Sequence, residues 1–323
     1  MIDRLLKKID EGVNFQKEDA VELLSVENGS HEYKQLVACA ANASRRVFGS
    51  SGYIFAQIGL NFSPCSGNCK FCSLAKCNHV FSEPVEKSPE EVLSVLHHID
   101  FSRVSTLFLM TTADFDAKKF LEMGAFVRCH IPPKVSLVAN TADFDLTYAL
   151  RLKDVGFTGA YHIVRLREGI DTDFPVEQRI ATLDAITAAG LQLYYCVEPI
   201  GPEHTYEELA TEMLRAREYH VDIMAAMRRV NVPGTACEDR GMINDAEMAK
   251  IVAVTRLVSM PRISMNVHEP LAAAMSCGVN QLYTELGINP RDTNEETEQG
   301  RGYDIDHVSS MLEQAGYYAF LCK

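Results

Sequence analysis

From Tyr53 onward, short apolar runs rich in β-branched and aromatic residues alternate with longer stretches whose apolar residues recur three and four positions apart. Runs of the first kind predict buried strands, and stretches of the second kind predict amphipathic helices. The predicted strands span residues 53–61, 105–112, 134–141, 159–166, 191–199, 223–232, 262–268 and 280–287. Eight strand–helix repeats in succession are typical of a (β/α)8 TIM-type barrel, an α/β fold with a closed parallel sheet.

Helical patterns also precede and follow this repeating region. Apolar residues three and four apart predict helices over residues 17–26 and 32–48, before the first strand. One more helix is predicted after the eighth strand, within residues 304–320. Within the barrel, the predicted helices span residues 88–99, 115–123, 144–156, 176–190, 206–220, 245–258 and 270–278. We therefore predict an N-terminal helical extension over residues 1–50 and a barrel with a C-terminal capping segment over residues 51–323.

The composition narrows the class of protein. The 323 residues have a hydrophobic content of 47%, which is enough for the single large core of a barrel. The formal net charge of −13 opposes non-specific binding to nucleic acids, because such binding requires a basic face. No stretch approaches the roughly 18 to 20 uninterrupted apolar residues of a membrane helix, and the charged start does not resemble a signal peptide. We expect a cytoplasmic protein without nucleic-acid or membrane partners.

The ten cysteines are too few and too unevenly spread for a disulfide scaffold in a chain of this length. Three of them, Cys65, Cys69 and Cys72, are spaced C-x3-C-x2-C in a stretch that is rich in turn-forming residues. Three thiolates can hold three irons of a [4Fe-4S] cluster and leave the fourth iron open to a ligand. The alternative is a structural zinc site that also draws on Cys77 and His79. We favour the cluster, because the chain contains no second C-x2-C pair.

Residues 61–72, NFSPCSGNCKFC, resemble the signature of the radical S-adenosylmethionine (SAM) superfamily, C-x3-C-x-aromatic-C. The resemblance implies that the open iron of a [4Fe-4S] cluster chelates SAM and that Phe71 contacts the adenine. It further implies that an electron donor such as flavodoxin or ferredoxin reduces the cluster. SAM is then cleaved to methionine and a 5'-deoxyadenosyl radical, which abstracts hydrogen from unactivated C–H bonds.

Weaker segments resemble one group of that superfamily, which contains biotin synthase, methylornithine synthase, the hydrogenase-maturation protein and the two-protein type of lipoyl synthase. The resemblance implies that Glu168 accepts hydrogen bonds from the SAM ribose, although a solvated loop charge is an equal alternative. It also implies that Gly201 allows the backbone to approach the adenine. The side chains of Arg165 and Arg167 could bind a carboxylate on one side of the chain. Asn140 is a candidate for contact with the SAM amino group.

A second cluster is also suggested by the resemblance. Biotin synthase has an auxiliary cluster whose ligands include a cysteine on strand five and an arginine on strand seven, and Cys196 and Arg262 stand near those positions here. The predicted second and third strands carry no cysteine. A differently placed cluster could instead use Cys77, Cys196, Cys237 and Cys322, since four thiolates suit a 4Fe cluster. The alternative for each of these cysteines is an ordinary buried thiol.

The leading functional hypothesis is a radical SAM sulfurtransferase of the biotin synthase type, in which an auxiliary cluster supplies sulfur to a small molecule such as dethiobiotin. A first alternative is sulfur insertion into an octanoylated carrier protein, as in lipoyl synthase. A second alternative is a sulfur-free radical mutase like methylornithine synthase. A third is a non-enzymatic binding protein stabilised by an iron–sulfur cluster or by zinc.

Overall fold

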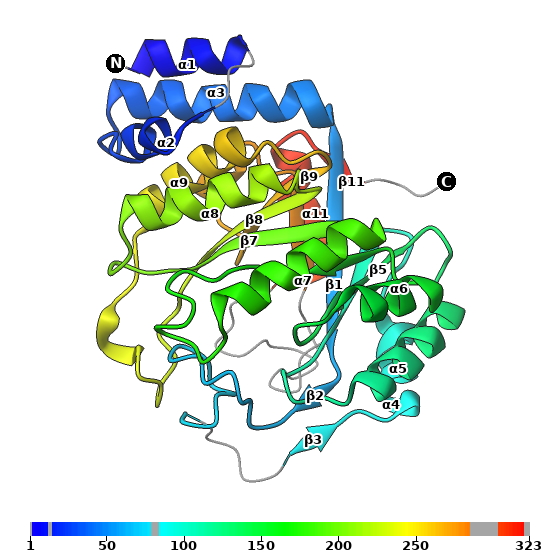
Figure 1. The fold of residues 1–323 in the computed structure, drawn as a ribbon. Coiled ribbons are helices and arrows are strands. Elements are labelled where there is room, and N and C mark those ends of the chain that lie inside the picture. The colour runs from blue at the N-terminus through cyan, green and yellow to red at the C-terminus, as the bar shows by residue number, and fades with distance from the viewer. Residues whose placement is uncertain (1, 12–14, 79–83, 285–302, 320–323) are drawn as a thin grey trace.

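Eight parallel strands close into a barrel in the order in which they occur along the chain (Figure 1). The computed structural model describes residues 2–11, 15–78, 84–284 and 303–319. Hydrogen bonds between the first and last barrel strands, at the pair Ile54 and Leu282, close the ring. The strands are β1 (Ser51–Gly59), β4 (Val104–Met110), β5 (Ser136–Asn140), β6 (Gly159–Tyr161), β7 (Gln192–Ile200), β8 (Ile223–Arg228), β9 (Ser264–His268) and β10 (Gln281–Thr284). The predicted (β/α)8 barrel is confirmed.

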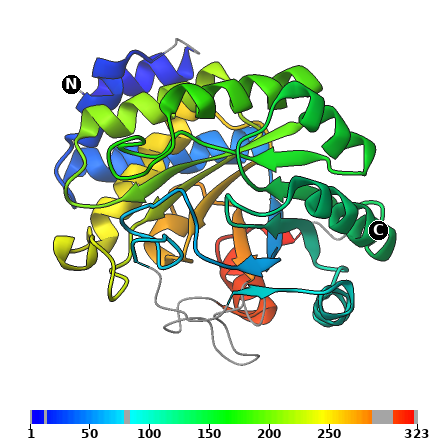
Figure 2. The same ribbon diagram turned by 60° about the horizontal axis from the view of Figure 1, so that its bottom comes forward.

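Helices surround the barrel and separate its strands, as the alternating pattern predicts (Figure 2). Several begin at a side-chain cap. The hydroxyls of Ser88 and Thr205 each accept a hydrogen bond from the backbone N–H of a glutamate three residues later, and the carboxylate of that glutamate accepts one from the N–H of the capping residue. This capping box satisfies backbone N–H groups that have no partner within the helix. The barrel helices are α4 (Pro89–His98), α5 (Ala117–His130), α6 (Leu146–Asp154), α7 (Val176–Ala189), α8 (Tyr206–Glu218), α9 (Asp245–Ser259) and α10 (Ala272–Met275).

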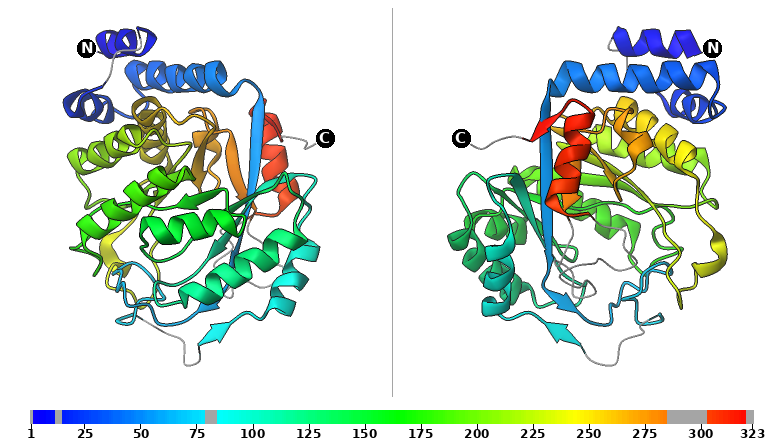
Figure 3. Two further views of the ribbon diagram at one scale, coloured as in Figure 1. Left: turned by 45° about the vertical axis from the view of Figure 1, so that its right-hand side comes forward. Right: turned by 180° about the vertical axis from the view of Figure 1, so that it is seen from behind.

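Three N-terminal helices, α1 (Ile2–Asp10), α2 (Lys17–Leu24) and α3 (His31–Phe48), lie beside the N-terminal end of β1 (Figure 1). The guanidinium of Arg256 on α9 is buried and joins α3 to the barrel, because it donates to Ser44 Oγ at 2.7 Å and to the carbonyl of Ala43 at 2.9 Å. At the other end of the chain, α11 (Ile305–Gln314) packs beside β1, and β11 (Tyr318–Ala319) pairs with the start of β1 (Figure 3). The helices predicted before and after the barrel are therefore present.

Aromatic rings fill the half of the barrel interior that lies toward the N-terminal ends of the strands. Inward positions alternate along each strand, and those of neighbouring strands meet at the barrel axis. Phe108 lies 5.2 Å from Tyr194 and 5.8 Å from Phe55 between ring centroids. These rings form a solid floor, so an open cavity can exist only above them, toward the C-terminal ends of the strands.

Several elements are shorter than predicted. The fourth barrel strand, β6, was expected over residues 159–166 but ends at Tyr161. Its continuation turns because the backbone N–H of Arg165 bonds to the Glu168 carboxylate and the N–H of Glu168 bonds to the carbonyl of Arg165. The helix expected over residues 270–278 comprises only Ala272–Met275. Among the described residues, no helix is both long and apolar enough to cross a bilayer.

Candidate active site

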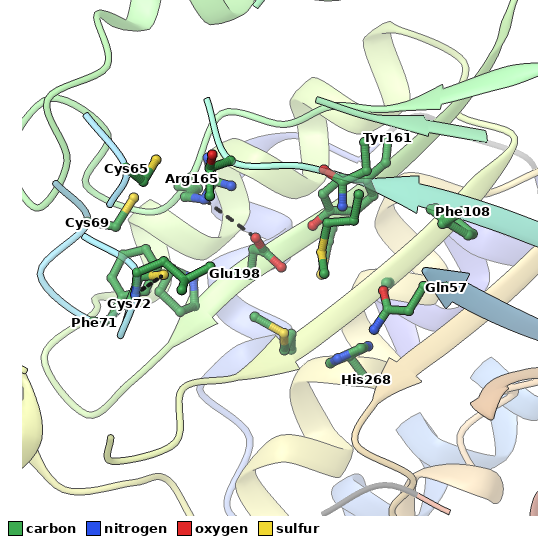
Figure 4. Close-up of a pocket in the computed structure, with 18 of the residues that line it drawn as sticks. Gln57, Cys65, Cys69, Phe71, Cys72, Phe108, Tyr161, Arg165, Glu198 and His268 are labelled. Atoms are coloured by element: carbon green, nitrogen blue, oxygen red, sulfur yellow. Dashed lines mark hydrogen bonds and ion pairs between the residues drawn. The ribbon is translucent and has the colours of Figure 1, made fainter. Parts of the chain in front are cut away.

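A pocket of about 400 Å³ opens above the aromatic floor, and all eight barrel strands contribute to its wall (Figure 4). This is the face where the loops after the strands gather, and TIM barrels carry their chemistry there. Its volume falls within the range of small-molecule sites. The strand residues that line it include Gln57, Met110, Asn140, Tyr161, Cys196, Glu198, Met227, Asn266, His268 and Tyr283.

Cys65, Cys69 and Cys72 line one wall of this pocket, on the connection that follows β1 (Figure 4). Backbone bonds fold the connection into a compact loop: the N–H of Cys65 donates to the carbonyl of Leu74 at 2.7 Å, and the N–H of Lys76 donates back to the carbonyl of Cys65 at 3.1 Å. The N–H of Cys72 donates to the carbonyl of Cys69 at 2.9 Å. We call residues 65–78 the cluster loop.

Asn78 holds the turn that carries two of these cysteines. Its buried amide nitrogen lies 3.3 Å from each of three carbonyl oxygens, those of Cys69, Lys70 and Cys72. One side chain thus donates to backbone carbonyls at both ends of the turn from Cys69 to Cys72. Sequence analysis missed Asn78, and its only signal is a polar residue shortly after the last cysteine of the motif.

The three thiols line one pocket, which suits a cluster that takes each thiolate on a different iron. Within the described ranges, no three His, Cys, Asp or Glu side chains converge on one ion position, as a zinc site would require. A cubane cluster takes each thiolate on a different iron, so the donors must face one cavity without meeting at a point. Cys77, the proposed fourth zinc ligand, is exposed, and His79 lies outside the described residues.

The Cys69 thiol is held in its protonated form unless a metal displaces the proton. Burial raises its pKa to about 12, nearby Arg165 opposes that effect, and the neighbouring Cys72 and Cys65 add to it. Thiolate is the form that binds metal, so the bound cluster must supply the compensating charge.

Phe71 and Asn140 both line the pocket, as the resemblance implies. Beside them, Asn61 joins the end of β1 to the end of β4: its amide donates to Thr112 Oγ1 at 2.7 Å, and its carbonyl accepts from the N–H of Thr112 at 2.9 Å. The hydroxyl of Thr111, directly after β4, lies 2.9 Å from the hydroxyl of Thr141, directly after β5. These hydroxyl and amide groups provide a polar wall adjoining the cysteines.

Arg165 places a positive charge in the same wall (Figure 4). Its Nε lies 3.6 Å from Glu198 Oε1, and its buried NH1 has no hydrogen-bond partner among the described residues. Burial alone would lower the pKa of Arg165, but Cys69, Glu198 and Glu168 raise it above the usual range, so the guanidinium stays charged. A buried cation with a spare donor is suited to bind a carboxylate.

Glu168 is not among the residues that line the pocket, and its expected contact with the SAM ribose stays a prediction. Its carboxylate is buried and already accepts hydrogen bonds from the hydroxyl of Thr172 at 2.5 Å and from the N–H of Arg165 at 2.9 Å. It therefore fixes the turn after β6. The acidic residues that line the pocket are Glu198, near the end of β7, and Glu269, directly after β9.

Arg167 and Gly201 also lie away from the pocket wall. Arg167 adopts φ of 58° and turns its side chain toward Asp171, with Nε 3.6 Å from the carboxylate. At position 201, glycine leaves room for neighbouring side chains of the protein. A Cβ there would lie 2.7 Å from a guanidinium nitrogen of Arg229 and 2.3 Å from Glu203 Oε2. The expected approach of Gly201 to the adenine stays a prediction.

The cysteines expected to hold an auxiliary cluster are dispersed. Cys196 lines the pocket, whereas Cys77 is exposed. Cys237 is buried within the loop after β8 and is not among the residues that line the pocket. Cys322 lies outside the described residues. The structure therefore brings one of the three described candidates to the pocket.

Arg262 requires a correction. It precedes β9, and its backbone N–H bonds to the carbonyl of Val221 at the start of β8, on the N-terminal rim of the barrel. Its side chain is 63% exposed and pairs with Asp222 at 2.6 Å. An arginine on that rim cannot reach a cluster in the pocket on the opposite side of the aromatic floor.

A polar group that sequence analysis missed forms the inner end of the pocket. Burial raises the pKa of the Tyr161 hydroxyl well above its usual value, and nearby Glu198 adds to the shift. Burial likewise raises the pKa of the Cys196 thiol, again with a contribution from Glu198. Both groups are therefore protonated at neutral pH. The only signal for Tyr161 in the sequence is its inward position on a strand.

Curated proteins similar in sequence are biotin synthases. That of Rippkaea orientalis is 25% identical over 272 residues, which cover 80% of this chain and 73% of that protein. That of Fusobacterium nucleatum is 22% identical over 333 residues, which cover 96% of this chain and 88% of that protein. No family model matches the chain.

Solved structures with a similar fold include a methylornithine synthase, with a TM-score of 0.80 and 18% identity over 97% of this chain and 96% of that one. A FeFe-hydrogenase maturase from Carboxydothermus hydrogenoformans also has a TM-score of 0.80, with 16% identity over 100% of this chain and 80% of that one. The resemblance to radical SAM enzymes of this group, which the cluster loop predicted, is confirmed.

Proposed function

We propose that this protein is a radical SAM enzyme that binds a [4Fe-4S] cluster through Cys65, Cys69 and Cys72 and acts on a small molecule in the barrel pocket. The observation that carries the proposal is the placement of three thiols with the superfamily's spacing on one wall of a closed barrel cavity. When bound, the cluster and SAM supply a 5'-deoxyadenosyl radical that abstracts hydrogen from a C–H bond.

The pocket residues have distinct tasks in this proposal. Arg165 binds the carboxylate of SAM through the guanidinium nitrogen that has no partner in the described protein. Glu198, which lies 3.6 Å from it, accepts hydrogen bonds from ligand hydroxyl or amino groups. Phe71 offers an aromatic face beside the cysteines, and Asn140 offers an amide on the opposite strand end.

The barrel protects a reactive radical from solvent. Phe55, Phe108 and Tyr194 close the floor, and each is at most 3% exposed. A substrate would therefore sit between this floor and the cluster loop, in a cavity whose floor is closed to solvent. The polar inner end, with Tyr161 and Cys196, favours a substrate that carries hydrogen-bonding groups as well as C–H bonds.

The cysteines that line the pocket favour a reaction that uses a single cluster, such as a sulfur-free radical rearrangement like that of methylornithine synthase. The residues of β4 and β5 that line the pocket are Phe108, Met110 and Asn140, and none is a thiol. An auxiliary cluster beside Cys196 would thus lack cysteine ligands from these two strands. We therefore rank the sulfur-free reaction first on structural grounds.

Sulfur insertion, with dethiobiotin as the small-molecule acceptor, is the second candidate. Two observations favour it: the curated relatives are biotin synthases, and Cys196 faces the pocket from β7. It requires a sulfur donor. An auxiliary cluster on Cys196 would be that donor, and its remaining ligands would come from residues outside those that line the described pocket.

Anaerobic reconstitution followed by cluster analysis tests both levels of the proposal. The purified protein is loaded with iron and sulfide, reduced with dithionite and mixed with SAM, and 5'-deoxyadenosine is quantified by chromatography. About four irons per chain, with formation of 5'-deoxyadenosine, supports the single-cluster reaction. More than about four irons, with a loss of the excess in Cys196→Ala, supports sulfur insertion. Failure to cleave SAM would overturn the proposed function.

Product analysis then separates the substrate classes. Dethiobiotin and, in parallel, a set of amino acids are incubated with the reduced enzyme, and products are identified by mass spectrometry. A product that has gained one sulfur and lost two hydrogens supports the second candidate. An isomer of unchanged mass supports the first. A flavodoxin or ferredoxin that replaces dithionite in the same assay identifies the class of electron donor.

A further inference from the structure

A buried carboxylate outside the pocket joins three loops of the active face. Asp171 lies on the connection between β6 and α7, and its side chain is 5% exposed. Lys70 of the cluster loop lies 3.2 Å from Oδ1, and Arg240, after β8, lies 3.2 Å from Oδ2. Arg167 is a third cation, 3.6 Å away. One carboxylate therefore receives charges from the loops after β1, β6 and β8.

The contact with the cluster loop is made by backbone as well as side chain. Lys70 stands between Cys69 and Phe71, and its N–H donates to the carbonyl of Asp171 at 2.9 Å. Its ammonium group also donates to the carbonyl of Ile170 at 2.7 Å. Because both ends of Lys70 are fixed to residues 170–171, the turn between the second and third cysteines cannot shift without breaking these bonds.

The residues after Asp171 continue along the same loop. The N–H of Asp173 donates to the carbonyl of Gly67 at 2.8 Å, and its carboxylate accepts from the amide of Asn68 at 2.7 Å. The ring of Phe174 lies where a side chain at position 67 would begin, since a Cβ on Gly67 would meet it at 2.3 Å. Residues 170–174 therefore contact the cluster loop at Gly67, Asn68 and Lys70.

The same segment also sets the position of the pocket arginine. Its turn begins at Arg165, whose N–H bonds to the Glu168 carboxylate, and Glu168 is bonded in turn to Thr172, next to Asp171. The cysteines and Arg165 are thus two ends of one hydrogen-bonded chain of residues. The pair of Lys70 and Asp171 is the charged link across the two loops, beside the bonds that Asp173 makes to Gly67 and Asn68.

We propose that Asp171 is a positioning residue, which holds the cluster loop at a fixed distance from Arg165 so that SAM can contact the cluster and the guanidinium at once. The inference rests on the proposed function. Asp171 acts through Lys70 and Arg240 and touches neither cofactor nor substrate. Residues that orient metal ligands from outside typically change affinity or activity by about 10- to 100-fold when they are replaced.

The test compares Asp171→Asn and Lys70→Gln with Lys76→Gln. The control removes the same charge from the same loop, but Lys76 is 55% exposed and 3.9 Å from Asp114, away from residues 170–174. Asp171→Asn preserves the shape of the side chain while removing the charge that attracts both loops. Lys70→Gln alters a residue that is 40% exposed, so it serves if Asp171→Asn does not fold.

Two readouts decide the outcome. In cluster-free protein, hydrogen exchange of residues 65–78 should be faster in Asp171→Asn and Lys70→Gln than in the wild type, and unchanged in Lys76→Gln outside position 76. In reconstituted protein, the two variants should keep about four irons but raise the KM for SAM by about 10- to 100-fold. They should also weaken the change that SAM causes in the electron paramagnetic resonance spectrum of the reduced cluster.

Other outcomes overturn the proposal. Wild-type exchange and a wild-type KM in Asp171→Asn and Lys70→Gln would show that the contact positions nothing. A lower melting temperature with an unchanged KM would assign Asp171 a role in stability only. An equal defect in Lys76→Gln would reduce the effect to loop charge. If the wild type cleaves no SAM, the proposed function fails, whereas the exchange experiment still decides whether Asp171 holds the loop.

Discussion

Replacing Arg165 with methionine tests the assignment of the pocket most directly. Methionine keeps an unbranched stem in the wall but removes the guanidinium that lies 3.6 Å from Glu198. In the described protein, NH1 of Arg165 is buried without a hydrogen-bond partner. A buried donor of this kind is costly until a ligand satisfies it. Binding of the SAM carboxylate should therefore recover free energy that the substitution removes.

The size of the effect follows from that unsatisfied nitrogen. A hydrogen bond to a charged group contributes about 1.5–3 kcal/mol. Because about 1.4 kcal/mol corresponds to a tenfold change in Kd, Arg165→Met should weaken SAM binding by about 10- to 150-fold. Stability should fall as well, since Glu198 loses a nearby cation. A melting curve of each variant separates that loss from the loss of binding.

The assay is anaerobic equilibrium dialysis of SAM against the reconstituted protein, with Arg228→Met as the matched control. Arg228 also lines the pocket, but its guanidinium already donates to Asp245 at 2.7 Å and to the carbonyl of Ile243 at 3.2 Å. We expect the control to change Kd by less than about threefold, as for an exposed ion pair. Unaltered SAM binding by folded Arg165→Met, or an equal loss in Arg228→Met, would refute the reasoning.

Three further predictions address the cluster loop and the fold. Cys72→Ala should lose most of the iron taken up on reconstitution, whereas Cys77→Ala, which alters an exposed thiol, should retain it; iron retained in the first would contradict the ligand assignment. Burial lowers the pKa of His162 to about 4, with Arg179 adding to the effect and Asp143 opposing it. The unfolded state, with a pKa near 6.5, therefore binds more protons between these values, and the histidine should cost about 2 kcal/mol of stability as pH falls from 7 to 5. Urea unfolding of His162→Gln should show a smaller loss, and an equal loss in both proteins would contradict the argument. Gly67→Ala should place a Cβ 2.3 Å from the Phe174 ring, cost about 1–3 kcal/mol and loosen the cluster loop; the double variant with Phe174→Leu should recover part of the melting temperature.

Most of the barrel was predictable because its strands are buried on both faces. Such strands are recognisable as apolar runs, and each predicted run overlaps an observed strand. The exception in length, β6, shows where the pattern stops being informative. Residues 162–166 remain apolar enough to extend a strand, but the carboxylate of Glu168 turns the backbone at Arg165. A side-chain bond of this kind leaves no trace in hydropathy.

The cysteine triplet was predictable because its chemistry is local, whereas the choice of carboxylate was not. Glu198 lies near the C-terminal end of β7 and Glu168 follows β6, so sequence position places both toward the active face. In the structure, the buried carboxylate of Glu168 accepts a hydrogen bond from the hydroxyl of Thr172, whereas Glu198 lines the pocket. Only the fold reveals which acid already has a partner. A general rule about strand ends can find the face, but it cannot rank the residues on it.

The error at Arg262 has a different origin and bears on the reaction. It came from matching an arginine by its strand, although Arg262 precedes β9 and His268 ends it. Six residues of extended chain span about 20 Å, so the two side chains lie on opposite rims. The exposed pairing of Arg262 with Asp222 on the N-terminal rim opposes a role for it as a cluster ligand in the pocket. Without it, the case for a second cluster depends on Cys196 and on residues outside the pocket wall. Iron analysis of Cys196→Ala therefore bears more directly on the choice between sulfur insertion and rearrangement than any comparison of overall fold.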